Sequence, residues 1–279
     1  MADRASFRPR PNTSGAAGHA NPAPAHGSRL TPGAPSQSNS NVYLDALLFT
    51  LIPIAAAAFS GLVVTIHTPR KQVTSAVQHL AAGVVFAAAA IELVPGVLHS
   101  APGPAIVGFA IGIAVMFALR QFSDAAERRS KRRGSPVAIG LIATIGIDFL
   151  IDGVVLGAGF ASDRSTGILL TIAIALEYLF VGLSVSATLP TRSPWALIGL
   201  PTMLALLTLV GAAIGVATLT GASKPVMAAV LGFGAVVFMY QVTEELLVKA
   251  HEQGDTAFGS ATFFVGFLCY LLIEQAMAS

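Results

Sequence analysis

Long apolar runs separated by short polar segments make up most of the chain after residue 43. A helix that crosses a bilayer needs about 20 predominantly apolar residues, and eight runs approach or exceed this length. They cover residues 44–66, 79–98, 104–121, 136–160, 167–189, 195–219, 225–248 and 257–277. The pattern predicts an all-α integral membrane protein whose eight helices form one transmembrane domain, residues 44–279.

The first 43 residues have a different composition, rich in proline, glycine, serine, asparagine and alanine, and no apolar run interrupts them. Such composition is typical of disordered chain, so we expect residues 1–43 to form a disordered N-terminal tail. Because the first apolar run begins only at Leu44, we interpret it as the first transmembrane helix and not as a secretory signal. The single cysteine, Cys269, excludes a disulfide within the chain.

The lysines and arginines predict the orientation, because cytoplasmic loops carry an excess of them. One set of alternate loops holds only Arg164 and Lys224. The other set holds Arg70, Lys71, Arg120, Arg128, Arg129, Lys131, Arg132, Arg133, Arg192 and Lys249. We therefore expect a multi-pass protein of the cell membrane, surrounded by lipid, with both termini on the non-cytoplasmic side.

Acidic residues are the unusual feature of the predicted spans. Of the 14 aspartates and glutamates in the chain, several fall well inside the spans, and no lysine or arginine is predicted at comparable depth. These acids are Glu92, Asp148, Asp152, Glu177, Glu244 and Glu245. A carboxylate at the bilayer centre costs at least about 2.5–3.5 kcal/mol, so such residues usually line a pathway or have a partner. Without a basic partner, the candidates are protons or a bound cation.

Asp148 and Asp152 have the spacing of one helical face, since residues four apart are neighbours on a helix. Two ionised carboxylates this close repel each other unless a cation lies between them or one keeps its proton. The alternative is that both aspartates only form hydrogen bonds to neighbouring helices. The same two possibilities apply to Glu177, whose neighbour Tyr178 we expect to be a helix-packing group. Gly153 and Gly157 should let another helix approach closely.

The remaining acids also have ordinary structural explanations that need no bound cation. Glu245 and Lys249 are four residues apart and can form an ordinary ion pair near a cytoplasmic helix end. Gln241 lies one turn before Glu245 and shares its face. Glu92 precedes Pro95, and a proline inside a span frees a backbone carbonyl that can serve a polar site.

An internal repeat links two of the predicted spans. "VVFAAAAIELVPGVLH", residues 84–99, matches "VVFMYQVTEELLVKAH", residues 236–251, at the VVF, at Glu92 and Glu244, and at the final histidine, without a gap. The two copies lie on the second and seventh helices, which cross the membrane in opposite senses, as inverted repeats of transporters do. We therefore expect a 3+2+3 arrangement, with helices one to three and six to eight related around helices four and five.

Taken together, these features resemble the ZIP family of divalent-metal transporters over most of residues 44–279. "HLAAGVVFAAAAIELVPG" is similar to the family's second helix. "DFLIDG" stands where the fourth helix carries His-Asn-x-x-Glu/Asp-Gly, so the resemblance maps Asp148 onto the histidine and Asp152 onto the acid. "EYLFVG" stands at the motif of the fifth helix, which maps Glu177 and Val181 onto ligand positions. "TEELLVKA" resembles the seventh helix, where spacing favours Glu245 as the ligand and the internal repeat favours Glu244.

The chain also departs from the family pattern. Asp148 replaces the usual histidine, Phe149 the asparagine, and Tyr178 and Val181 occupy two positions of the fifth-helix motif. A two-metal site would be reduced to one site made mostly of carboxylates. Oxygen ligands suit harder ions such as manganese or magnesium, whereas imidazole suits zinc, copper and iron.

The resemblance implies a transporter that moves a divalent cation through a carboxylate site between helices four, five and seven. The metal ligands would come from Asp148, Asp152, Glu177, Glu245, Glu244 and Glu92. The ion is cargo, with zinc, manganese and iron as candidates, and no cofactor is expected. The resemblance is also compatible with a homodimer.

Two other functions are compatible with parts of the sequence. One is a homologue of the same fold that senses, scaffolds or conducts protons. The other is an intramembrane metalloprotease, because "EELLVK" is similar to an EExxxR signature. That family needs further histidines and arginines in later helices, and no lysine or arginine follows Lys249. We therefore predict that the protein is not an enzyme.

Overall fold

The computed structural model describes residues 39–67, 70–132, 139–189, 193–252 and 257–278. Most of the predicted N-terminal tail lies outside these ranges. The first helix begins at Asn39, so the last residues of that predicted tail are helical. All regular secondary structure in the described residues is helical, which agrees with the prediction of an all-α protein.

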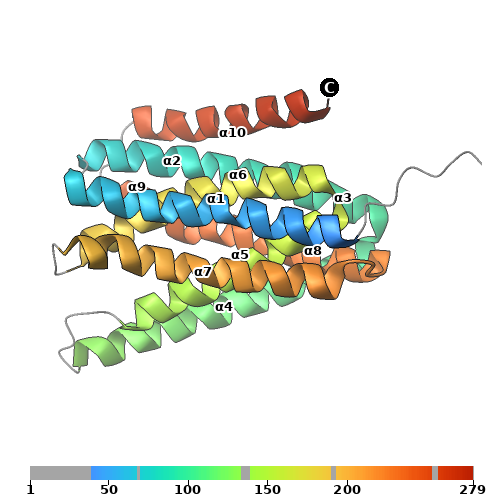
Figure 1. The fold of residues 1–279 in the computed structure, drawn as a ribbon, viewed down its shortest axis with the longest axis horizontal. Coiled ribbons are helices and arrows are strands. Elements are labelled where there is room, and N and C mark those ends of the chain that lie inside the picture. Colours follow the sequence, from blue (N-terminus) through green and yellow to red (C-terminus); the bar gives the residue numbers. More distant parts are fainter. Residues whose placement is uncertain (1–38, 68–69, 133–138, 190–192, 253–256, 279) are drawn as a thin grey trace, which may run out of the picture. The chain divides into compact units, whose positions relative to one another are not determined.

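Eight spans in the described residues are long and apolar enough to cross a membrane, which confirms the number predicted from the apolar runs. Their elements follow the chain in the order shown in Figure 1. They are α1 (Asn39–Ile66), α2 (Lys71–Ala87), η1 (Ala88–Leu93), α3 (Val94–Ser100), α4 (Pro102–Arg132), α5 (Ile139–Ser162), α6 (Arg164–Thr188), α7 (Pro194–Leu219), α8 (Lys224–Tyr240), η2 (Gln241–Leu246), α9 (Leu247–Glu252) and α10 (Ala257–Ala278).

Local sequence signals explain several helix starts. The Asp163 carboxylate accepts hydrogen bonds from the backbone N–H groups of Ser165, at 2.8 Å, and Thr166, at 3.3 Å, and so caps α6. Prolines in the first turns of α7 and α8 need no backbone partner there. Between these two helices Gly221 has a φ of 79°, a left-handed conformation that glycine adopts without strain.

The second and seventh spans each contain a π-helical segment, η1 and η2. The offset that aligns residue 84 with residue 236 in the internal repeat places η1 on residues 240–245, within one residue of η2. Such π-helical turns are rare and occur frequently at functional sites. The internal repeat therefore coincides with a repeated π-helical segment. Of the polar residues, Glu92 lies in η1 and Gln241 in η2.

Helix packing follows a paired pattern. Figure 1 shows α10 beside α2 at one edge and α4 toward the opposite edge, where it packs on α8. The most extensive of the remaining contacts join α5 to α7, and α1 to both α6 and α7. The first three spans can be exchanged with the last three, and α5 with α6. This exchange turns the α2–α10 pair into the α4–α8 pair and the α5–α7 pair into the α1–α6 pair, and it leaves the α1–α7 pair unchanged. The 3+2+3 arrangement itself stays a prediction.

Glycines allow α5 and α7 to approach backbone to backbone. A Cβ atom added to Gly153 would lie 2.9 Å from the Ala212 nitrogen and from the Gly211 Cα. One turn further on, a Cβ on Gly157 would lie 2.8 Å from the nitrogen of Val216. Both distances are too short for a carbon atom, so a larger residue would force the helices apart. The close approach expected at Gly153 and Gly157 is present, and α7 is the partner.

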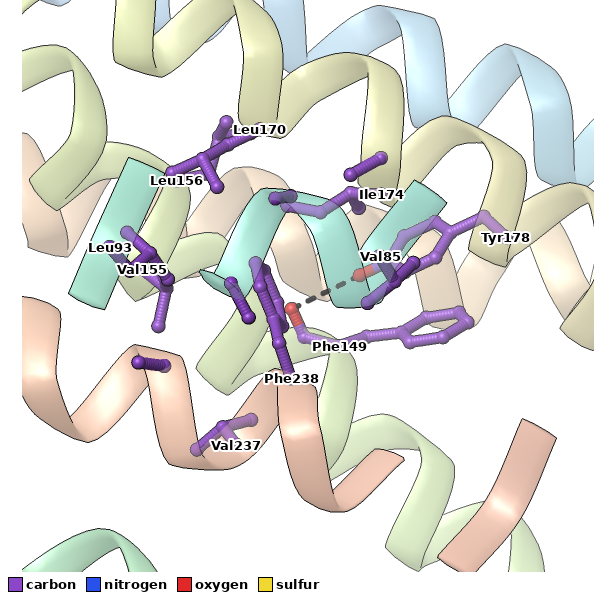
Figure 2. Close-up of a cluster of buried hydrophobic side chains, with 14 of the residues drawn as sticks. Val85, Leu93, Phe149, Val155, Leu156, Leu170, Ile174, Tyr178, Val237 and Phe238 are labelled. Atoms are coloured by element: carbon purple, nitrogen blue, oxygen red, sulfur yellow. Dashed lines mark hydrogen bonds between the residues drawn. The ribbon is translucent and has the colours of Figure 1, made fainter. Parts of the chain in front are cut away.

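Beside this contact lies a buried apolar cluster, drawn in Figure 2. It joins α5 and α6 to α8 and to the second span, and it contains Val85, Leu93, Phe149, Val155, Leu156, Leu170, Ile174, Tyr178, Val237 and Phe238. Other large apolar side chains remain exposed on α4 and α10, among them Ile106, Phe117 and Phe264. An apolar outer face suits contact with lipid, as expected of helices that line the perimeter of a membrane protein.

Candidate metal centre

Three buried carboxylates from two neighbouring helices meet inside the bundle. Asp148 and Asp152 come from α5 and Glu177 from α6, and one oxygen of each lies within 4.8 Å of the others. Their exposed fractions are 5%, 0% and 2%, so all three carboxylates are almost completely buried. The helical spacing of the two aspartates puts them on one face of α5, and the packing of α6 brings Glu177 to that face.

A glutamine from the seventh span lies between the two aspartates. The Gln241 side chain, at the start of η2, donates through Nε2 to Asp148 Oδ2 at 2.9 Å and to Asp152 Oδ1 at 3.1 Å. Gln241 is completely buried. Its amide N–H groups take the place that a cation would need between two carboxylates, and they reduce the repulsion between Asp148 and Asp152.

Tyr178 closes the centre on the α6 side. Its hydroxyl lies 3.3 Å from Asp152 Oδ2 and 2.5 Å from Thr208 Oγ1, and its ring stacks on Phe149 at a centroid distance of 3.8 Å. Figure 2 shows the same hydroxyl pointing toward the carbonyl oxygen of Phe149, 3.4 Å away. One hydroxyl proton cannot serve all these acceptors at once, so Tyr178 satisfies Asp152 only in part.

Several oxygen atoms of the centre have no hydrogen-bond partner among the described residues. Asp148 Oδ1, Glu177 Oε2 and Gln241 Oε1 are all buried and unpartnered. A buried acceptor without a donor costs about 1–3 kcal/mol, and more when it is charged. The centre thus contains three unsatisfied oxygen atoms, and such atoms attract a hard divalent cation or protons.

A cavity of about 390 Å³ reaches the centre from one end of the bundle. Its lining includes the buried Asp148 together with the exposed Arg120 and Asp124, so it connects the centre to the surface. Lys249 also contributes to the lining. Arg120 and Lys249 belong to the basic set that predicts the cytoplasmic side.

The opposite side of the centre is filled by apolar side chains. Val155 and Leu156 follow Asp152 by one turn of α5, and Leu170 and Ile174 precede Glu177 by one to two turns on α6. All four are buried and belong to the apolar cluster of Figure 2. The centre therefore has a polar approach from one end and a packed apolar barrier toward the other.

The other predicted ligands lie outside the three-carboxylate cluster. Glu245 lines the cavity beside Asp148 and forms an ion pair with Lys249 at 3.7 Å. Glu244 is exposed and pairs with Arg120. The ion pair of Glu245 with Lys249 agrees with the ordinary structural explanation that the sequence offered for Glu245. The expectation that the acids have no basic partner is wrong for Glu244, because the long side chain of Arg120 reaches it from α4.

Glu92 occupies a separate cavity. This second cavity, of about 370 Å³, is lined by Glu92, Ser162, Thr166 and Lys224 among others, and shares no lining residue with the first. The Thr166 hydroxyl donates to Glu92 Oε2 at 3.4 Å. The structure thus separates Glu92 from the centre, because it lies on the second span beyond the apolar cluster.

Two residues of the centre carried little sequence signal. The sequence indicates only that Gln241 shares a face with Glu245, and it predicts a packing role for Tyr178. No sequence signal marks Thr208, which contacts the Tyr178 hydroxyl from α7. A buried glutamine one turn before an acid, inside the internal repeat, was the signal available for Gln241.

The sequence model of the ZIP zinc transporter family matches residues 121–278, more than half of the chain. The chain belongs to the ZIP zinc transporter family. A comparison with curated proteins found no match. The matched segment includes Asp148, Asp152, Glu177 and Gln241, whereas Glu92 lies before it. This ZIP protein is thus a multi-pass membrane protein of a metal-transporter family, and membership of a family of transporters supports a non-enzymatic role.

Proposed function

We propose that this ZIP protein moves a divalent metal cation across the membrane through one site formed by Asp148, Asp152 and Glu177. The observation that carries the proposal is the set of buried, unpartnered oxygen atoms on Asp148, Glu177 and Gln241. Such atoms are costly in an apolar interior unless a ligand completes them. A divalent cation would complete the carboxylate oxygens and neutralise two of the three carboxylates.

The Gln241 amide would stand in for a cation between the two aspartates. Its Nε2 hydrogen bonds hold Asp148 and Asp152 together, and an arriving cation must displace this amide from between them. Rotation of the amide would then present Gln241 Oε1, now unpartnered, as a neutral ligand. The residue would stabilise the carboxylates when the site is empty and coordinate the cation when it is occupied.

The cavity supplies the route on one side. Glu245 lies on its wall beside Asp148, so we assign it as the next carboxylate on the path between the centre and the surface. Because Arg120 and Lys249 line the same cavity, we place its mouth on the cytoplasmic side of the cell membrane and both termini on the other side. The present conformation is then open inward, and the apolar cluster blocks the outward route.

Transport requires a second conformation in which the outer side of the centre is open and the cytoplasmic cavity is closed. Carboxylates bind metal only when deprotonated, so ion entry would release protons that the empty, closely spaced acids hold. Movement of the helices around α5 and α6 would then open the outward side and close the cavity, as in other transporters with midplane sites. The ligand set contains only oxygen atoms and suits manganese and magnesium, while zinc and iron remain candidates as cargo of the family.

Flux measurements in proteoliposomes test the proposal. The double variant Asp148→Asn, Asp152→Asn should reduce uptake of radioactive manganese and zinc to the level of empty liposomes, and Glu177→Gln should lower it strongly. Glu274→Gln on α10 is the matched control and should keep wild-type flux, because Glu274 lines neither cavity and interacts with Glu92, not with the three-carboxylate centre. Circular dichroism must show that all variants fold. Wild-type flux in the folded double variant would remove the two aspartates from the pathway.

A second candidate function is proton conduction without metal transport. It is favoured by one observation: Gln241 already fills the gap between the aspartates, and Tyr178 extends the hydrogen-bonded chain from Asp152 to Thr208. The same liposomes loaded with a pH-sensitive dye distinguish the two functions. Acidification that needs no added metal, together with metal flux at background level, would favour the proton conductor.

A further inference from the structure

Two histidines face each other at a helix contact separate from the acidic centre. His79 belongs to α2 and His251 to α9, and their ring centroids lie 5.3 Å apart with an interplanar angle of 65°. His79 is buried, with 1% of its surface exposed, whereas His251 is exposed. Neither residue lines the cavity that reaches Asp148. The pair thus joins a buried imidazole to one that solvent can reach.

Both rings have the same hydrogen-bonding pattern. His79 Nδ1 lies 2.9 Å from the carbonyl oxygen of Ser75, and His251 Nδ1 lies 2.5 Å from that of Leu247. A carbonyl oxygen only accepts, so each Nδ1 carries the proton and each neutral ring has its lone pair on Nε2. Metal-binding histidines in proteins commonly show this pattern, with the second nitrogen donating to a backbone carbonyl.

The Nε2 lone pair of the buried His79 ring is not used in any hydrogen bond among the described residues. His79 Nε2 is buried and has no hydrogen-bond partner among the described residues. A polar atom in this position needs an explanation, such as a missing water or ion. A metal ion accepts such a lone pair, and the second imidazole, in the same tautomer, offers it another.

The separation of the rings fits a shared metal ion. With a metal–nitrogen distance of about 2.0–2.1 Å and a tetrahedral angle at the metal, two imidazoles bound through Nε2 have ring centroids about 5.2 Å apart. The observed distance of 5.3 Å agrees with this value. The contact is also fixed independently of the rings, because the Ser75 hydroxyl donates to the carbonyl oxygen of Ala250 at 3.1 Å and so ties α2 to α9.

We propose that His79 and His251 bind one transition-metal ion of the zinc, copper or nickel class through their Nε2 atoms. Water completes the coordination from the exposed side of His251. The ion links the second span to the end of the seventh and is distinct in chemistry from cargo held by the carboxylates, because imidazole selects borderline metals while oxygen ligands suit manganese and magnesium. The inference does not depend on the transport function of the acidic centre.

Copper electron paramagnetic resonance on the purified full-length protein tests this site. Copper(II) bound by imidazole shows nitrogen hyperfine structure, and each variant is compared with wild type at the same copper-to-protein ratio. We expect His251→Ala and His79→Gln each to lose one equivalent of nitrogen-coordinated copper per chain. His67 is an exposed histidine at the end of α1, so His67→Ala is the matched control. This variant should keep the equivalent of nitrogen-coordinated copper that the His79 and His251 variants lose.

Two further measurements separate this site from the acidic centre. The Asp148→Asn, Asp152→Asn variant should keep the copper signal, and excess manganese should not compete for it. If His79→Gln fails to fold, His251→Ala decides alone, because its side chain is exposed. Retention of the full nitrogen-coordinated copper signal in folded His251→Ala would overturn the proposal and leave the two rings as an aromatic packing pair.

Discussion

Replacement of Gln241 by leucine removes the only side-chain amide that contacts the aspartates among the described residues. Leucine has a similar size but no donor, so Asp148 and Asp152 lose the hydrogen bonds of 2.9 and 3.1 Å that they receive from Gln241. In the metal-free protein no other group replaces these donors completely, since Tyr178 reaches only Asp152. The variant should therefore be less stable when metal is absent.

The size of the effect follows from the two contacts. A hydrogen bond to a charged group contributes about 1.5–3 kcal/mol, so the loss of both should lower the free energy of unfolding by about 3–6 kcal/mol. The lower part of this range applies if one aspartate takes up a proton and thereby relieves the repulsion.

Gln78 provides a matched control. It is also a completely buried glutamine, but neither Nε2 nor Oε1 has a partner among the described residues. Gln78→Leu removes an unsatisfied buried amide and should raise the free energy of unfolding by about 1–3 kcal/mol. Gln241→Leu and Gln78→Leu should thus differ by at least about 4 kcal/mol in opposite directions relative to wild type.

Both variants can be unfolded reversibly in mixed micelles by added dodecyl sulfate, with a chelator present, and followed by circular dichroism. The difference in unfolding free energy is then measured without any contribution from bound metal. Equal destabilisation by the two substitutions would refute the reasoning, because it would mean that loss of the amide itself, and not of its bonds to the aspartates, determines stability.

Three further substitutions test other parts of the structure. Gly153→Ala should cost about 1–3 kcal/mol in thermal or micellar unfolding, because its Cβ would meet the α7 backbone, whereas Gly103→Ala, with open space around it, should cost almost nothing. Tyr178→Phe should cost about 1–3 kcal/mol, because it leaves Thr208 without its 2.5 Å partner; Tyr43→Phe serves as the control. Asp163→Ala should lower stability by about 0.5–2 kcal/mol through loss of the α6 cap, and Asp163→Asn should restore most of it.

The number and order of the membrane spans could be predicted because a bilayer demands long apolar runs, and the chain shows them directly. The residues at which the helices end could not be predicted. α4 continues to Arg132 through a charged segment, well beyond the apolar run that ends near residue 121. Apolarity marks the part of a helix in the membrane, whereas the helix itself continues wherever its backbone hydrogen bonds do.

The carboxylates of the centre could be predicted for a similar reason. Asp148 and Asp152 lie one turn apart deep within an apolar run, and a buried charge is expensive enough to be conspicuous. Gln241 is neutral and carries no such signal, and its role depends on its side chain reaching from η2 to Asp148 and Asp152 on α5. The pairing of Glu244 with Arg120 could not be predicted, because it depends on the packing of α4 on α8 and not on the depth of either residue in its own helix.

The central claim is that a divalent cation binds between Asp148, Asp152 and Glu177, and anomalous X-ray scattering from crystals soaked in manganese or zinc tests it most directly. We predict one anomalous peak within coordination distance, about 2.0–2.3 Å, of an oxygen atom of each carboxylate, and its loss in the double variant Asp148→Asn, Asp152→Asn. A saturated crystal with no peak among these three residues, or with peaks only elsewhere, would contradict the account.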